Sequence, residues 1–217
     1  MDINQDIDHL EGLMPTAWPS SDADLLAEDD DWWFVACIDW QQGQWHGYVE
    51  GFRQAAHLIV NQIHSTAHGQ DTLIFPFLTS WRHYAEIQLK SLITYLHTYL
   101  EQPSESLKKT HRIDELWRTT RALLEEAGCA DDSDELDHVQ RVLRQLHALD
   151  PTAQHFRYPV TVNGAPTLAG VRRIHMRRFH EAMEGVACFL DAAETGISSM
   201  LDLRSEHEAE MAREADW

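Results

Sequence analysis

The sequence lacks the features that place a chain in a membrane or in an oxidising compartment. No run approaches the roughly 18 to 20 apolar residues that a bilayer-spanning helix needs, and the N-terminal stretch MDINQDIDHLEG is acidic where a secretory signal is basic. The three cysteines stand at wide spacings without a C-x-x-C pair, which argues against a disulfide framework and against a thiolate zinc site. We therefore expect a cytoplasmic protein with free thiols and no membrane partner.

Positive charge is also scarce. The chain has 17 lysines and arginines against 36 aspartates and glutamates, a formal net charge of −19 at pH 7. A field of this sign repels phosphate backbones at long range, which excludes a general nucleic-acid coat. Acidic runs at 22–31, 131–137 and 205–216 carry much of the excess. Such runs are typical of solvated faces or chain ends, with a docking tail or a nucleic-acid mimic as the alternative.

What the sequence does contain is a series of helical patterns. Apolar residues recur at steps of three and four over 47–64, 73–100, 113–128, 133–150 and 170–204. The stretch FRYPVTVNGAP alternates and includes Asn163-Gly164, which predicts a small hairpin or flap at 156–166. We expect an all-α bundle of about five helices in three parts: an acidic, Trp-rich segment (1–46) packed on the core, the helical domain (47–204) and an acidic C-terminal tail (205–217). Aromatic residues cluster in the first part, at Trp32, Trp33, Phe34, Trp40 and Trp45.

The second predicted helix carries a row of polar residues at the edge of its apolar face. Arg82, Glu86 and Lys90 follow one another at steps of four, so Glu86 can bridge both cations, and His83 lies beside them. One interpretation is a structural ion-pair row buried by a neighbouring helix or a second subunit. The others are a site in which His83 carries a proton and Arg82 holds phosphate, or simple exposure to solvent.

The last predicted helix begins with the strongest basic cluster of the chain. In VRRIHMRRFH, four arginines lie within seven residues, at 172, 173, 177 and 178. On a continuous helix Arg173, Arg177 and His180 fall on one face. The cluster predicts either contacts to phosphate or RNA, or ion pairs with the acidic helices and the acidic tail.

Several motifs in order resemble the HEPN superfamily (higher eukaryotes and prokaryotes nucleotide-binding). They are RHxxExxLK from Arg82 to Lys90, H-x(4)-L-W from His111 to Trp117, FRYP from Phe156 to Pro159, and the closing helix MRRFHEAMEGVACFLD, and the likeness covers roughly 47–200. The resemblance implies an all-α bundle that is commonly dimeric. The superfamily contains metal-independent ribonucleases of toxin–antitoxin and antiphage defence systems, and also many non-catalytic members.

The resemblance also implies site residues. The ribonuclease members carry an Arg-x(4–6)-His motif, in which the imidazole moves a proton at the ribose 2′-OH and the guanidinium offsets phosphate charge. Arg173 and His180 fit this spacing, whereas Val162 stands five residues after Arg157, where the family usually places the motif. The candidate catalytic residues are Arg173 and His180 from this motif, and Arg82, His83 and Glu86 from the polar row. The candidate RNA or phosphate ligands are Arg172, Arg177 and Arg178 from the basic cluster.

No cofactor motif and no metal site are indicated, since the pair His64 and His68 lacks a third ligand. Two functions from different classes remain. The first is a homodimeric HEPN-like ribonuclease or nucleotide-binding effector. The second is a non-catalytic interaction or regulatory protein, an acidic partner of a basic protein from a neighbouring gene. The apolar surface of the helices at 73–100 and 170–204 predicts the homodimer.

Overall fold

The computed structural model describes residues 18–19, 21–27, 30–39, 44–103, 110–129 and 134–215, and it divides into units 1–40 and 41–217. In the first unit the 3₁₀ helix η1 (Trp32–Phe34) exposes its three aromatic side chains, and the rings of Trp32 and Trp33 stack with centroids 3.9 Å apart. Trp40 lies outside the described residues. The packing of segment 1–46 on the core stays a prediction.

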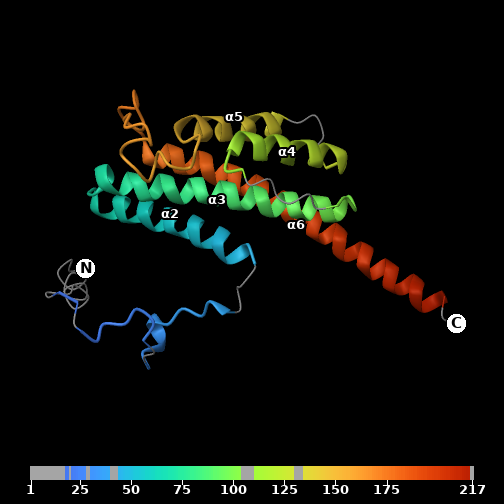
Figure 1. The fold of residues 1–217 in the computed structure, drawn as a ribbon. Helices are drawn as coiled ribbons and strands as arrows, with labels where there is room; N and C mark the ends of the chain where they lie inside the picture. The colour runs from blue at the N-terminus through green and yellow to red at the C-terminus, as the bar shows by residue number, and fades with distance from the viewer. Residues whose placement is uncertain are drawn as a thin grey trace. The chain divides into compact units, whose positions relative to one another are not determined.

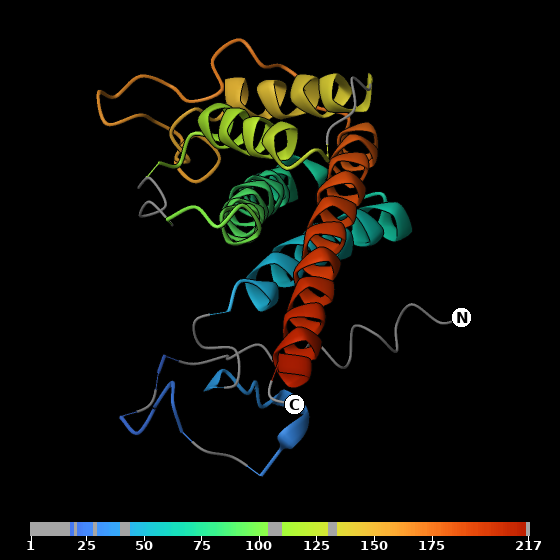
Figure 2. The same ribbon diagram turned by 90° about the vertical axis from the view of Figure 1, so that its right-hand side faces the viewer.

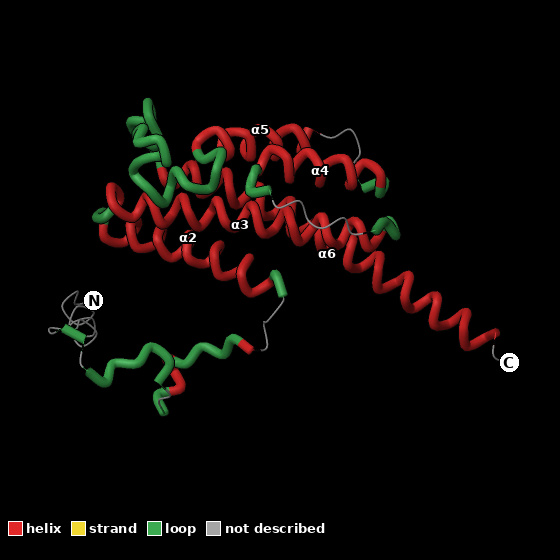
Figure 3. Tube along the Cα trace, viewed as in Figure 1, coloured by secondary structure: helices red, strands yellow, loops and turns green. Residues whose placement is uncertain are grey.

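The second unit confirms the predicted all-α bundle (Figure 1, Figure 3). Its helices are α2 (His46–Thr66), α3 (Gln70–Tyr99), α4 (Ile113–Glu126), α5 (Asp134–Leu149) and α6 (Met176–Ala215). The predicted flap at 156–166 is a loop that contains one isolated β-bridge, between Val160 and Pro166, and the described residues form no strand. Gly164 turns the flap at φ +78°, a conformation that suits glycine. No helix among the described residues has the length and apolarity needed to cross a membrane.

Helix α3 is the centre of the bundle. It packs against α2, α4 and α6, while α5 covers α4 and α6 (Figure 1, Figure 2). Because neighbours surround α3, apolar side chains around most of its circumference are fully buried, among them Phe77, Trp81, Tyr84, Leu89, Leu92 and Leu96. A polar side chain on such a helix must find a polar partner inside the protein, since burying it unpaired is costly.

Helix α6 differs from its prediction at both ends. It begins at Met176 rather than near Gly170, so Arg172 and Arg173 lie in the non-helical segment before it. The carbonyl of His175 accepts the first helical bond from Phe179 at 3.0 Å, and the Nδ1 atom of His175 accepts from the N–H of Arg178 at 3.4 Å. At the other end, residues 205–215 of the expected acidic tail are helical, because Ala, Glu, Met and Arg favour helices. Figure 1 shows this end of α6 extending past the other helices of the bundle.

Candidate functional site

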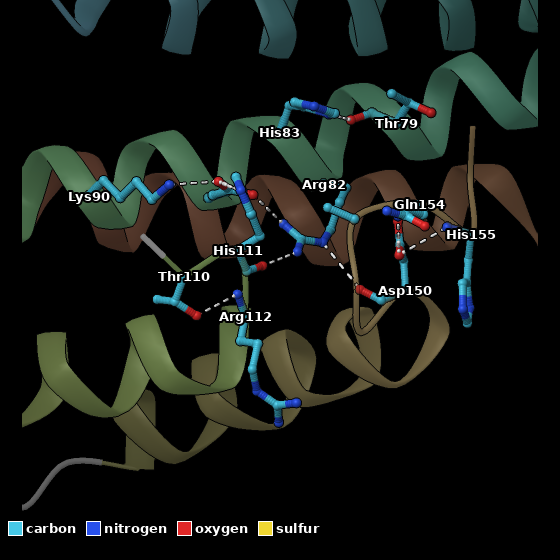
Figure 4. Close-up of polar contacts among 12 residues, drawn as sticks. Thr79, Arg82, His83, Lys90, Thr110, His111, Arg112, Asp150, Gln154 and His155 are labelled. Atoms are coloured by element: carbon cyan, nitrogen blue, oxygen red, sulfur yellow. Dashed lines mark hydrogen bonds and ion pairs between the residues drawn. The ribbon is translucent and has the colours of Figure 1, made fainter. Parts of the chain in front are cut away.

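The polar row on α3 is the centre of a buried junction, which we call the α3 junction (Figure 4). Glu86 bridges two cations as predicted: its Oε2 lies 3.1 Å from Nη1 of Arg82 and its Oε1 lies 2.7 Å from Nζ of Lys90. The same Oε1 lies 2.7 Å from Nδ1 of His111. The side chains of Arg82 and Glu86 are only 1% and 9% exposed. The α3 junction comprises Arg82, Glu86, Lys90, His111 and Asp150.

Arg82 ties three helices together. Its guanidinium donates to the carbonyl of His111, just before α4, and its Nε donates to the carbonyl of Asp150, just after α5, at 3.4 Å. The Asp150 carboxylate in turn accepts the backbone N–H groups of Gln154 at 2.8 Å and His155 at 3.1 Å. Each of these buried groups therefore has a partner within the protein, which favours the structural interpretation of the row.

The charges of the α3 junction support one another. Burial by itself raises the pKa of Glu86, but hydrogen bonds from Lys90 and His111, with the charges of Lys90 and Arg82, outweigh it and lower this pKa. Burial lowers the pKa of Arg82, and the carboxylates of Glu86 and Asp150 oppose that effect. A carboxylate already shared among three donors offers little to a substrate.

His83 faces away from Arg82, toward α2 (Figure 4). Its Nδ1 lies 2.9 Å from the carbonyl of Thr79, and its ring stacks on Phe52 with centroids 5.0 Å apart. Arg82 and His83 are neighbours in the sequence, but they belong to different packing layers. Neither residue lines the hollows described below.

A second set of polar residues follows the line along which α2 and α6 pack antiparallel, and we call it the α2–α6 seam. At one end Nη2 of Arg177 lies 3.1 Å from Nδ1 of His64. Further along, Nε2 of His57 lies 3.0 Å from Oε1 of Glu184. At the other end Arg53 holds two carboxylates, each at 2.7 Å. The seam comprises Arg53, His57 and His64 on α2, and Arg177, His180, Glu184 and Asp191 on α6.

His180 lies in the middle of this seam. Its ring meets that of His57 edge-on, with centroids 4.6 Å apart, and also lies 5.4 Å from the ring of Trp81. Its Nδ1 is buried and has no hydrogen-bond partner among the described residues. Burial, followed by the nearby His57, lowers the pKa of His180, so its imidazole is neutral at pH 7.

Two adjoining hollows lie where the segment before α6 crosses the α2–α3 turn, and together we call them the arginine groove. The first has a volume of about 360 Å³, and Asp71, Phe75, Arg172 and Arg173 line it. The second, of about 560 Å³, is lined by His64, His175 and Arg177. The two hollows share the lining residues Gln70, Ile174 and Met176.

Arg172, Arg173 and Arg177 line the arginine groove, whereas Arg178 is not among its lining residues. None of these four arginines forms an ion pair with a carboxylate within the described ranges, and all four are exposed. The expected pairing of the cluster with acidic helices is therefore not seen there. By contrast, five arginines elsewhere do hold carboxylates: Arg53, Arg82, Arg112, Arg121 and Arg204.

The structure separates the two members of the predicted Arg-x(6)-His motif. Arg173 lines the arginine groove, whereas His180 lies in the α2–α6 seam and is not among the residues that line the groove. Because Arg173 precedes α6, the helical spacing expected between the two residues does not apply. Sequence reasoning missed His57, His175 and Glu184. Only the i, i+4 spacing of His180 and Glu184 on α6 signals part of this set.

Comparison of the chain with family models, curated proteins and solved structures found no match.

Proposed function

We propose that this chain is a cytoplasmic HEPN-like protein that binds the phosphates of RNA or of a nucleotide in the arginine groove. The observation that carries the proposal is a set of exposed arginines that line a hollow and form no ion pair with a carboxylate among the described residues, in a chain of net charge −19. In a strongly acidic protein, cations gathered without such partners are available to an anionic ligand. The motifs from Arg82 to Lys90 and from Phe156 to Pro159 support membership of the superfamily.

The geometry suggests how a polynucleotide would be held. Arg172 and Arg173 line the groove from the segment before α6, and Arg177 lines it as the second residue of the helix. Guanidinium groups suit phosphate because their planar donors match two of its oxygens. Asp71 lines the same groove and repels phosphate locally, so it limits how deeply a second phosphate can sit.

The groove also contains two imidazoles suited to metal-independent cleavage, His64 and His175. In such cleavage one imidazole takes the proton of the ribose 2′-OH, whose oxygen attacks the adjacent phosphorus. The other gives a proton to the departing 5′ oxygen, and the products are a 2′,3′-cyclic phosphate and a 5′-hydroxyl. The contact with Arg177 occupies Nδ1 of His64 and leaves the proton on its Nε2, so His64 can take a proton only once this contact opens. Because His180 does not line the groove, we assign proton transfer to His64 and His175 in its place.

Binding of a short fluorescein-labelled single-stranded RNA, measured by fluorescence anisotropy across a salt series, tests the proposal. Each phosphate contact that is lost reduces the slope of log K against log salt concentration by about 0.7 for a single strand. We expect this reduction in R173A and in R177A. The control is R141A, because Arg141 is exposed on α5 and lies outside the groove. An equal slope in all four proteins would contradict the proposal.

Cleavage is then tested on the same RNA in EDTA. We expect wild-type protein and H180A to release cyclic-phosphate ends, and H64A and H175A to lose this activity by about 100-fold or more. Loss confined to H180A would return the proton-carrier role to the residue that the sequence motif selects. If the RNA binds but none of these proteins cleaves it, the proposed phosphate site stands and the proposed ribonuclease activity is excluded.

A second candidate function, the interaction protein, is favoured by the exposed end of α6. Met200, Leu203 and Met211 are 42%, 65% and 54% exposed there, among acidic residues. We propose that this end of α6 mediates the homodimer or holds a basic partner from a neighbouring gene. Light scattering that gives a particle of 25.0 kDa at micromolar concentration would exclude the homodimer. A truncation before residue 200 tests whether this end of α6 is needed for the homodimer.

A further inference from the structure

We propose that His57, His180 and Glu184 form a binding site for a divalent transition-metal ion, with Zn²⁺ as the ion of best fit. Each residue offers one ligand atom, and the three atoms all lie within 4.8 Å of one another. Two imidazoles and one carboxylate are a donor set that Zn²⁺ uses in sites with an open fourth position. The site is distinct from the arginine groove and does not depend on its function.

The helices bring the three ligands together from both sides of the seam. His180 and Glu184 lie four residues apart on α6, so both project toward α2, and His57 meets them from α2. Bonds of 2.0 to 2.1 Å to a tetrahedral zinc ion place its ligand atoms about 3.3 Å apart. His57 Nε2 and Glu184 Oε1 already lie 3.0 Å apart. Side-chain rotation that brings the His180 ring inward by up to about 1.5 Å completes the triangle.

The contacts of each ligand suit a metal. The buried Nδ1 of His180 has no hydrogen-bond partner among the described residues. The Glu184 carboxylate is held by Arg53 at 2.7 Å, which fixes its orientation. The His57 side chain is 44% exposed, which gives an ion a path from solvent. A metal ion would take the place of the direct contact between His57 and Glu184.

Arg53 is the evident obstacle, and its contacts show why it does not block the site. Its charge is shared between Glu184 Oε2 and Asp191 Oδ2, both at 2.7 Å. Its Nε lies further from Glu184 Oε1, at 3.3 Å, so this oxygen is the one a metal can take. Arg53 would then remain on Oε2 as an outer partner that orients the ligating carboxylate, an arrangement common around metal sites.

Zn²⁺ titration into tag-free, metal-stripped protein tests the site, with competition against a chromogenic chelator as the readout. Cys37, Cys129 and Cys188 are exposed and offer competing thiols, so alkylated protein is used. We expect one Zn²⁺ per chain, and affinity at least tenfold lower in H57Q and in E184Q, since even outer-shell changes cost about 10- to 100-fold. The control H138Q changes an exposed histidine on α5 and should bind like wild type.

A second measurement guards against variants that merely unfold. His57 is the most exposed ligand, so H57Q should melt like wild type in EDTA and lose only the rise in melting temperature that Zn²⁺ gives the wild-type protein. Co²⁺ in place of Zn²⁺ should show visible absorption typical of nitrogen and oxygen ligands, absent in H57Q. No Zn²⁺ bound by alkylated wild type, or equal binding by H57Q and H138Q, would overturn the proposal.

Discussion

The α3 junction and the α2–α6 seam contain the same kinds of side chain, arginine, glutamate and histidine, in different surroundings. In the junction, Glu86 shares its carboxylate among three donors and Arg82 is 1% exposed. In the seam, Arg53 and Glu184 are 20% and 23% exposed, and His180 keeps an unpartnered Nδ1 among the described residues. Although the His111 side chain is 64% exposed, the Arg82–Glu86 pair is buried and fully bonded, which suits a role in the fold, whereas the open and incompletely bonded groups of the seam can accept a ligand.

The largest expected effect comes from breaking the junction. Glu86→Ala leaves the buried guanidinium of Arg82 without its carboxylate, and we expect a loss of about 3 kcal/mol in the free energy of unfolding. Chemical denaturation measures it. A loss well below 1 kcal/mol would show that the junction tolerates an unpaired charge and would remove the contrast with the seam.

A smaller loss is expected in the seam. Arg53→Met keeps much of the side-chain volume but removes ion pairs to Glu184 and Asp191. Because water reaches these groups, we expect a cost of about 1 to 2 kcal/mol by the same measurement. A cost equal to that of Glu86→Ala would place the seam with the junction as a structural cluster.

The contribution of Glu86 to stability also depends on pH. The pKa of Glu86 is lowered from its usual value of about 4.5, so its ionised form stabilises the fold above that pH, and the contribution is lost as pH falls through the lowered value. The stability gap between wild type and Glu86→Gln should therefore be constant near neutrality and narrow below about pH 4.5. Glu184 also has a lowered pKa, but it is present in both proteins, so its contribution cancels in the stability difference between them. A gap that widens on acidification would contradict the assignment.

The smallest effect is expected at an exposed pair. Arg121 contacts Glu125 and Asp137, whose side chains are 54% and 68% exposed. Such pairs contribute little, because water and salt screen them. Arg121→Ala should leave the unfolding midpoint unchanged within error, and a clear decrease would show that exposure is a poor guide to these clusters.

Much of the fold could be predicted from apolar spacing. The bounds of α2, α4 and α5 agree closely with the expected helices, and Gly128 lies in the left-handed conformation after α4, as a C-terminal glycine should. Helix α3 begins at Gln70 rather than near Leu73, because the carbonyl of Gly69 accepts bonds from Thr72 and Leu73. The spacing of apolar residues does not predict such a capping geometry.

The sites were predictable only where they are local. The bridge from Arg82 through Glu86 to Lys90 follows from steps of four along one helix. The contacts of Arg82 with His111 and Asp150 depend on how separate helices meet. The meeting of His57 with His180 and Glu184 depends on the register between α2 and α6, which the sequence of either helix alone does not encode.

The reach of Arg82 has a kinetic consequence. Its bonds to the carbonyls of His111 and Asp150 span 29 and 68 residues of chain. Contacts of that span close long loops, so we expect them to form late in folding. A bond that forms after the rate-limiting barrier affects the unfolding rate more than the folding rate. Replacing Arg82 should therefore shorten the lifetime of the folded bundle by raising its unfolding rate more than it lowers its folding rate.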